Sequence, residues 1–272
     1  MPELPEVETT RRGIAPHVEG STLREVVVRE PRLRWPVPAT LAADSADQPL
    51  EGLTRRAKYL IFRLPRGNLL LHLGMSGSVR VIEAATERAL KLHDHVDLRF
   101  DRATLRFNDP RRFGSLLWAP HPVESHPLLA ELGPEPLGDD FDGDYLFARS
   151  RGRRGAVKNF LMDGHVVVGV GNIYASESLH EAGISPTRPA GRVSRARYHR
   201  LAQTVREVLQ RAIDSGGSTL RDFLRSDGSP GYFQLKLAVY GREGEPCRTC
   251  GSAIRQRVIG QRASYYCPQC QR

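Results

Sequence analysis

The four cysteines of the chain lie in two closely spaced pairs. Cys247 and Cys250 form the first pair, sixteen residues follow, and Cys267 and Cys270 form the second. Two residues between thiolates let each pair hold one edge of a tetrahedron, so this spacing predicts a Zn²⁺ site closed by a hairpin. Four thiolates fill the coordination shell, which predicts one structural zinc ion and not a catalytic one. Two disulfides and a redox dithiol are the alternatives, but no secretory signal supports the first and two matched pairs argue against the second.

The first residues of the chain offer a nucleophile. If Met1 is removed, Pro2 presents a secondary α-amine, and an α-amine has an unperturbed pKa of ~7.7–8.0, so a useful fraction is neutral at pH 7. Attack of this amine on a carbon at the aldehyde oxidation level gives an iminium ion, which is an electron sink. Glu3 is adjacent and can act as a general acid or base. The alternative is that Pro2 and Pro5 only stiffen the start of the chain.

Lys58 is one of only four lysines, against 36 arginines. It precedes a run of apolar strand residues, where loss of water would lower its pKa and make the amine reactive. The alternative is a surface lysine whose aliphatic stem packs on apolar neighbours.

Two kinds of segment point to a nucleic acid. Residues 166–174, VVVGVGNIY, open a predicted helix, and glycines before a helix N-terminus expose N–H groups that can hold a phosphate. A tight turn between packed helices is the alternative. The loops at 74–77 and 109–114 carry Met75, Arg111 and Phe113, which are either core residues or wedges for a base stack.

The charge is distributed unevenly along the 272 residues. Residues 1–150 carry 20 Lys+Arg and 22 Asp+Glu, a net of −2, and residues 151–272 carry 20 and 9, a net of +11. The second half therefore predicts a surface that faces phosphates, although a solvated basic face without a partner fits the count equally. The longest uncharged runs have 13 residues, too short to span a bilayer. With no signal peptide visible, we expect a cytoplasmic protein.

The elements that must position these residues change in kind along the chain. A helix is predicted at 6–18, followed by short strands at 22–30, 56–64, 68–73, 78–82, 96–100, 104–107 and 115–118, which suggests a sandwich or barrel. Helices are predicted at 172–182 and 194–215, and paired strands around the cysteines. We expect domains at 1–130, 146–235 and 236–272, with a linker at 131–145 inside a segment rich in Pro, Gly and Asp.

Taken together, these residues resemble the formamidopyrimidine-DNA glycosylase family, bacterial base-excision repair enzymes that remove oxidised purines. The resemblance covers the full length, and its motifs occur in the family's order. They are PELPEVE at 2–8, RAKYL at 56–60, HLGMSG at 72–77, HDH at 93–95, DPRRFG at 109–114, VGVGNIYASE at 168–177, SDGSPGYF at 226–233 and QRASYYC at 261–267.

The resemblance implies an α+β protein. A two-layer β-sandwich with a leading helix is followed by a helical domain with a helix–two-turn–helix motif and by a zinc-finger β-hairpin, with DNA in the cleft between. It implies that the damaged base is flipped out, that Pro2 attacks C1′ to form a Schiff base, and that Glu3 assists base departure. Elimination of the 3′ and then the 5′ phosphate follows, with Lys58 and Arg262 in proton-transfer or phosphate roles. Because guanidinium stays charged, we expect Arg262 to stabilise phosphate.

The resemblance also implies a set of DNA contacts. Asn172 and the backbone around Gly171 hold phosphates near the lesion, and Met75, Arg111 and Phe113 fill the gap left by the flipped base. Further contacts are His72, His93, Arg154, Lys158 and Tyr232, the last in the loop that covers the extruded base. Asn159 stands where the family usually has proline, so the start of that helix is expected to differ.

The expected partner is duplex DNA that contains an oxidised base, bound by a monomer without a nucleotide cofactor or a membrane. The nearest alternative is the related endonuclease VIII, which uses the same chemistry on oxidised pyrimidines; the Leu4 and Arg-Arg-Phe motifs favour the purine enzyme. A zinc-dependent DNA-binding protein without catalysis is the alternative from another class.

Overall fold

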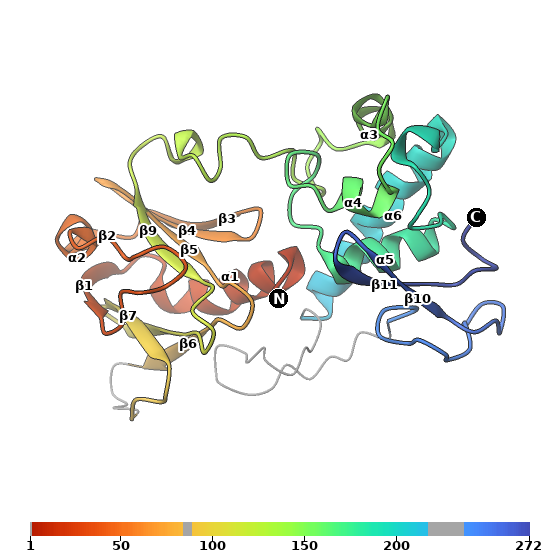
Figure 1. Ribbon diagram of the computed structural model, residues 1–272. Helices are drawn as coiled ribbons and strands as arrows, with labels where there is room; N and C mark the ends of the chain where they lie inside the picture. Colours follow the sequence, from red (N-terminus) through yellow and green to blue (C-terminus); the bar gives the residue numbers. More distant parts are fainter. Residues whose placement is uncertain (1, 84–88, 217–236) are drawn as a thin grey trace. The chain divides into compact units, whose positions relative to one another are not determined.

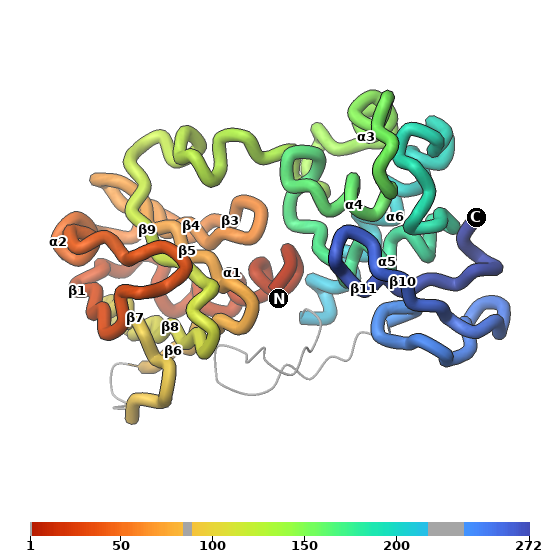
Figure 2. The backbone as a smooth tube through the Cα atoms, viewed as in Figure 1, coloured from red at the N-terminus to blue at the C-terminus, as the bar shows by residue number. Residues whose placement is uncertain are grey.

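The computed structural model describes residues 2–83, 89–216 and 237–272, and these fall into two compact units. The first spans residues up to Glu131, and the second contains residues 132–215 and 237–272. Figure 1 labels the helices and strands, and Figure 2 traces the chain through both units. No described helix is long and apolar enough to cross a membrane.

The first unit is a β-sandwich with a leading helix, as predicted. One sheet has the order β2-β1-β7-β8-β6 and the other the order β3-β4-β5-β9, and every pairing is antiparallel. The first sheet contains β1 (Thr22–Val28), β2 (Gln48–Pro49), β6 (Ser78–Glu83), β7 (Asp94–Phe100) and β8 (Ala103–Asn108). The second contains β3 (Gly52–Arg56), β4 (Tyr59–Leu64), β5 (Gly67–His72) and β9 (Ser115–Ala119).

One apolar core joins both sheets to α1 (Leu4–Val18). Its members include Val7 and Ile14 from the helix, Leu98 from the first sheet and Leu60 and Leu71 from the second. The helix contacts β3 and β4 on one side and β6 and β8 on the other, so its apolar face is covered by both layers. Two short elements complete the unit, α2 (Leu41–Ser45) and the 3-10 helix η1 (Val123–Ser125).

The strand predicted at 56–64 is confirmed over residues 59–64 as β4, but its first residues differ. The structure has two strands there, β3 and β4, which pair as a hairpin with Arg56 opposite Tyr59. Ala57 adopts φ 54°, a left-handed conformation that is uncommon for a residue other than glycine, and this turns the chain. Lys58 therefore lies in a hairpin turn.

The second unit combines a helical bundle with a zinc-finger hairpin. Its helices are α3 (Gly143–Ser150), α4 (Val157–Leu161), α5 (Asn172–Glu181), η2 (Ala190–Arg192) and α6 (Arg195–Asp214). The Asp142 and Ser194 side chains cap α3 and α6 by accepting main-chain N–H groups. α5 packs between α6 and β11 (Arg262–Tyr266), which pairs with β10 (Arg255–Ile259). The predicted helices at 172–182 and 194–215 and the paired C-terminal strands are confirmed.

Candidate functional site

The start of α1 holds Pro2 and Glu3 in buried positions. Glu3 is the N-cap of the helix. Its backbone N–H donates to the Glu6 carboxylate at 2.8 Å, and its own carboxylate accepts from the Glu6 backbone N–H. These two hydrogen bonds form a capping box. The Glu3 and Glu6 side chains are only 2% and 1% exposed. Pro2 lies just before this cap, at the positive end of the helix dipole. Sequence reasoning missed Glu6, although its spacing of three residues from Glu3 was the signal.

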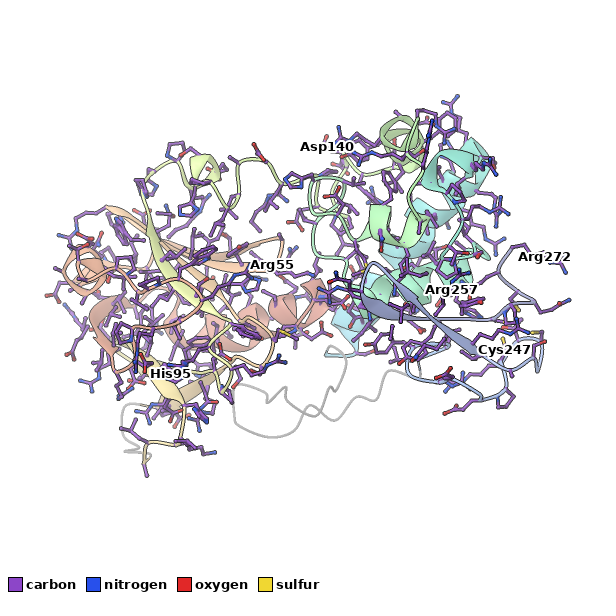
Figure 3. The ribbon with its side chains drawn as sticks, in the orientation of Figure 1. Arg55, His95, Asp140, Cys247, Arg257 and Arg272 are labelled. Carbon is purple, nitrogen blue, oxygen red and sulfur yellow. The ribbon has the colours of Figure 1, made fainter. Side chains whose placement is uncertain are left out.

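Arg55 connects α1 to the hairpin turn that carries Lys58 (Figure 3). Its Nε donates to the Glu8 carboxylate at 3.3 Å, and its Nη1 donates to the Ala57 carbonyl at 2.8 Å. Burial alone would raise the pKa of Glu8, but hydrogen bonds from Arg11 and Arg12 and the charge of Arg55 outweigh it, so the pKa is lowered. The ion pair places the Lys58 turn against the first half of the helix.

His72 is held neutral at the end of β5. Its Nδ1 accepts a hydrogen bond from the Gly74 backbone at 2.9 Å, so the Nε2 atom carries the proton of the neutral ring. Burial, followed by the positive charges of Lys58 and Arg34, lowers the pKa of His72 to about 4. The ring also packs on Tyr59, with centroids 4.8 Å apart. The arrangement offers one N–H donor beside a lysine, which suits contact with an anion.

The fully buried carboxylate of Asp109 joins the two loops that carry the proposed wedge residues. It accepts hydrogen bonds from Ser76 Oγ at 2.9 Å and from the Gly114 backbone at 2.7 Å. Gly74 adopts φ 67°, and a Cβ there would lie 2.3 Å from Gly114 N, so at this point the two backbones approach too closely for any side chain. Sequence reasoning gave Asp109 no role, although it opens the DPRRFG motif.

The three predicted wedge residues lie on these joined loops. Phe113 is 43% exposed, and the Arg111 guanidinium stacks 4.8 Å from its ring centroid. Met75, half-buried, is in the other loop. His93 is half-buried before β7 with φ 71°, and its ring meets that of His95, whose Nε2 is 2.8 Å from the Asp109 carbonyl. An exposed arginine–phenylalanine pair on a braced loop is able to enter a base stack.

In the second unit, Lys158 binds the start of α5 to the hairpin. Its fully buried Nζ lies 2.6 Å from Asn172 Oδ1 and 2.6 Å from Ser264 Oγ. Asn172 follows Gly171, the N-cap of α5, and its Nδ2 donates to the Ala263 carbonyl at 3.0 Å. The predicted phosphate-binding residues are thus brought together, with Lys158 behind Asn172. Sequence reasoning missed Ser264.

Arg262, the first residue of β11, is exposed at the hairpin tip. Gly260 and Gln261 precede it with φ of 55° and 63°, which makes the turn tight. Arg154 is exposed in the loop before α4, and that helix begins at Val157 with Asn159 on its exposed side. Tyr232 and the rest of the 226–233 loop lie outside the described residues, as does Met1.

The four cysteines form one compact cluster. Their Sγ atoms all lie within 4.8 Å of one another (Figure 3), close to the ~3.8 Å edges of a tetrahedron with Zn–S bonds of about 2.3 Å. The backbone N–H groups of Thr249 and Cys270 point to Cys247 Sγ and Cys267 Sγ, as is expected around metal-bound thiolates. The cysteines fit one structural Zn²⁺.

Comparison with known proteins places the chain in a family. The N-terminal domain of formamidopyrimidine-DNA glycosylase matches residues 1–116, its H2TH domain matches 132–224, and the zinc finger found in FPG and IleRS matches 244–272. The chain belongs to the formamidopyrimidine-DNA glycosylase family. A formamidopyrimidine-DNA glycosylase of Stenotrophomonas maltophilia is 60% identical over the whole of both chains.

Solved structures of family members superpose along the whole chain. A complex of wild-type Lactococcus lactis Fpg with DNA containing N7-benzyl-Fapy-dG is 33% identical, covers 100% of both chains and gives a TM-score of 0.88. A structure of MutM with DNA containing carbocyclic 8-oxo-G has the same identity, coverage and TM-score. The family and the β-sandwich, H2TH and zinc-finger architecture that the sequence predicted are both confirmed.

Proposed function

We propose that this glycosylase is bifunctional, excising 8-oxoguanine and formamidopyrimidines from duplex DNA and then cleaving the strand as an AP lyase. The observation that carries this proposal is the buried Pro2–Glu3 pair fixed by the capping box at the start of α1. Relatives solved with Fapy-dG and 8-oxo-G DNA support the choice of oxidised purines over pyrimidines.

The chemistry follows from a neutral amine beside a carboxyl group. The Pro2 nitrogen attacks C1′ of the flipped nucleotide, the bond from C1′ to the base breaks, and Glu3 assists opening of the sugar as the base leaves with its electron pair. The resulting iminium acidifies the 2′ hydrogens. Removal of one as a proton expels the 3′ phosphate, and a second elimination expels the 5′ phosphate.

The other site residues serve phosphate and base positioning in this proposal. Lys58 and the Nε2–H of neutral His72 contact the backbone of the damaged strand, and Arg262 stabilises a leaving phosphate. Asn172 and the backbone at Gly171 hold a phosphate at the start of α5. Lys158 acts behind Asn172, because its ammonium already binds the Asn172 amide oxygen. Met75, Arg111 and Phe113 fill the gap left by the base, and the remaining DNA contacts are His93, Arg154 and Tyr232.

The zinc ion has no step in this reaction. Held by Cys247, Cys250, Cys267 and Cys270, it supplies the cross-link that gives the short hairpin a fixed shape. It thereby positions the exposed Arg262 at the tip.

Borohydride trapping tests the proposal. Incubation with an 8-oxoguanine duplex and borohydride should give a covalent adduct that mass spectrometry maps to Pro2, and an added N-terminal residue should abolish it. A matched chain carrying Pro5→Ala, which keeps the terminal amine, should still be trapped. Mapping to Lys58 would refute the nucleophile assignment.

Two further readings separate the alternatives. Faster excision of thymine glycol than of 8-oxoguanine would favour the endonuclease VIII-like function. Tight DNA binding with no adduct, together with a retained Met1 in the intact mass, would favour a non-catalytic DNA-binding protein.

A further inference from the structure

One face of α5 is fastened to the zinc finger at two points a single turn apart. The Glu177 carboxylate accepts hydrogen bonds from three consecutive backbone N–H groups, those of Ala238 at 2.6 Å, Val239 at 3.0 Å and Tyr240 at 2.9 Å. His180 follows three residues later and therefore lies on the same face. Its Nε2 is 3.7 Å from the Cys247 sulfur.

The surroundings of His180 define its hydrogen bonding. The side chain is 9% exposed, and its Nδ1 is a buried atom with no hydrogen-bond partner among the described residues. A neutral imidazole has one N–H, and a buried N–H without an acceptor is more costly than an unused lone pair. The proton therefore belongs on Nε2, where it points at sulfur.

Cys247 is a buried thiolate that such a donor can stabilise. It is buried at 3% exposure, in an apolar cluster with Val239, Ile254 and Cys267. Within that cluster water has little access to its sulfur, and a zinc-bound thiolate keeps much of its negative charge. An N–H···S hydrogen bond offsets this charge and fixes the direction of the sulfur lone pairs.

We propose that His180 is a positioning residue of the zinc centre, donating an Nε2–H hydrogen bond to the Cys247 thiolate from outside the coordination shell. Glu177 holds residues 238–240 on the same helix, so the two side chains together attach the start of the zinc-finger segment to α5. The helix that begins at Asn172 and the zinc-bound hairpin are then held rigidly together. The proposal concerns metal retention and stands independently of the lyase chemistry.

The full-length protein loaded with ¹¹³Cd²⁺ and labelled with ¹⁵N-histidine gives a direct test. A neutral His180 should be protonated at Nε2, and its proton should show scalar coupling to ¹¹³Cd through the sulfur. A ring protonated at Nδ1, with no such coupling, would overturn the proposal. This measurement uses the unmutated chain, so it does not depend on a variant that folds.

Variants give the second test. His180→Phe fills the same space without a donor, and we expect zinc release to a competing chelator to be about 10- to 100-fold faster. His180→Gln restores an N–H donor and should recover part of the loss, whereas His199→Phe, on the exposed side of α6, should release zinc at the unmutated rate. A His180→Phe protein that folds and retains zinc as well as the unmutated chain would contradict the proposal.

Discussion

The Glu177 carboxylate should contribute strongly to the stability of the second unit, and Glu177→Gln tests this contribution. Glutamine keeps one carbonyl oxygen, enough for the N–H groups of Val239 and Tyr240, which share Oε1 of the glutamate. Its NH₂ group faces the N–H of Ala238 in place of Oε2, so that donor loses its acceptor. A buried N–H group without an acceptor costs about 1–3 kcal/mol of stability. Each of the other two hydrogen bonds weakens by about 1 kcal/mol because its acceptor is no longer charged.

We therefore expect Glu177→Gln to destabilise the second unit by about 3–5 kcal/mol. Equilibrium urea unfolding of the zinc-loaded chain, followed by far-UV circular dichroism, measures this. Glu181→Gln is the matched control one turn along the same helix. Its carboxylate pairs with Arg211 at 2.5 Å where both side chains are partly exposed, and such pairs contribute ~0–1 kcal/mol. Equal losses in the two variants would refute the reasoning.

Three further predictions follow from the site. Gly74→Ala should abolish 8-oxoguanine excision in a chain that still binds zinc, because its Cβ would meet the Gly114 backbone at 2.3 Å; undiminished excision would contradict the close approach. His72 has a pKa of about 4, below the unfolded value of ~6.5, so the folded state binds fewer protons and stability should fall as the pH drops from about 6.5 toward 4. His72→Gln should flatten that part of the stability–pH curve, and an unchanged slope would refute the assignment. A strong chelator should unfold the hairpin and abolish DNA binding, and zinc-free protein that binds normally would contradict this.

Several features of this molecule could be predicted from the sequence because they depend on local residue spacing. The cysteine pairs, the helix face at 194–215 and the short strands are signals carried by neighbouring residues. Family motifs named Pro2, Glu3 and the loop residues, since the resemblance runs along the whole chain. Glu6 also belongs to this group, because its position three residues after Glu3 is the spacing of a capping box.

Other features depend on residues that meet only after folding. Lys158 binds Ser264 106 residues away, and Glu177 binds backbone 61 to 63 residues away. No periodicity in one sequence reports such pairs. The break at Ala57 was unpredictable for a different reason, because alanine carries no turn signal and adopts φ 54° only when its surroundings require it. Buried Asp109 resembles any loop aspartate until its partners are known.

The attachment of the hairpin to α5 has a consequence for how the chain assembles. A zinc finger stabilised only by its own metal ion would fold independently of the rest of the chain. Here its backbone at 238–240 binds a helix that lies 61 to 63 residues earlier, so we expect capture of the ion to be coupled to docking of the finger on α5. Zinc depletion would then lower the stability of the helical bundle as well as that of the zinc finger.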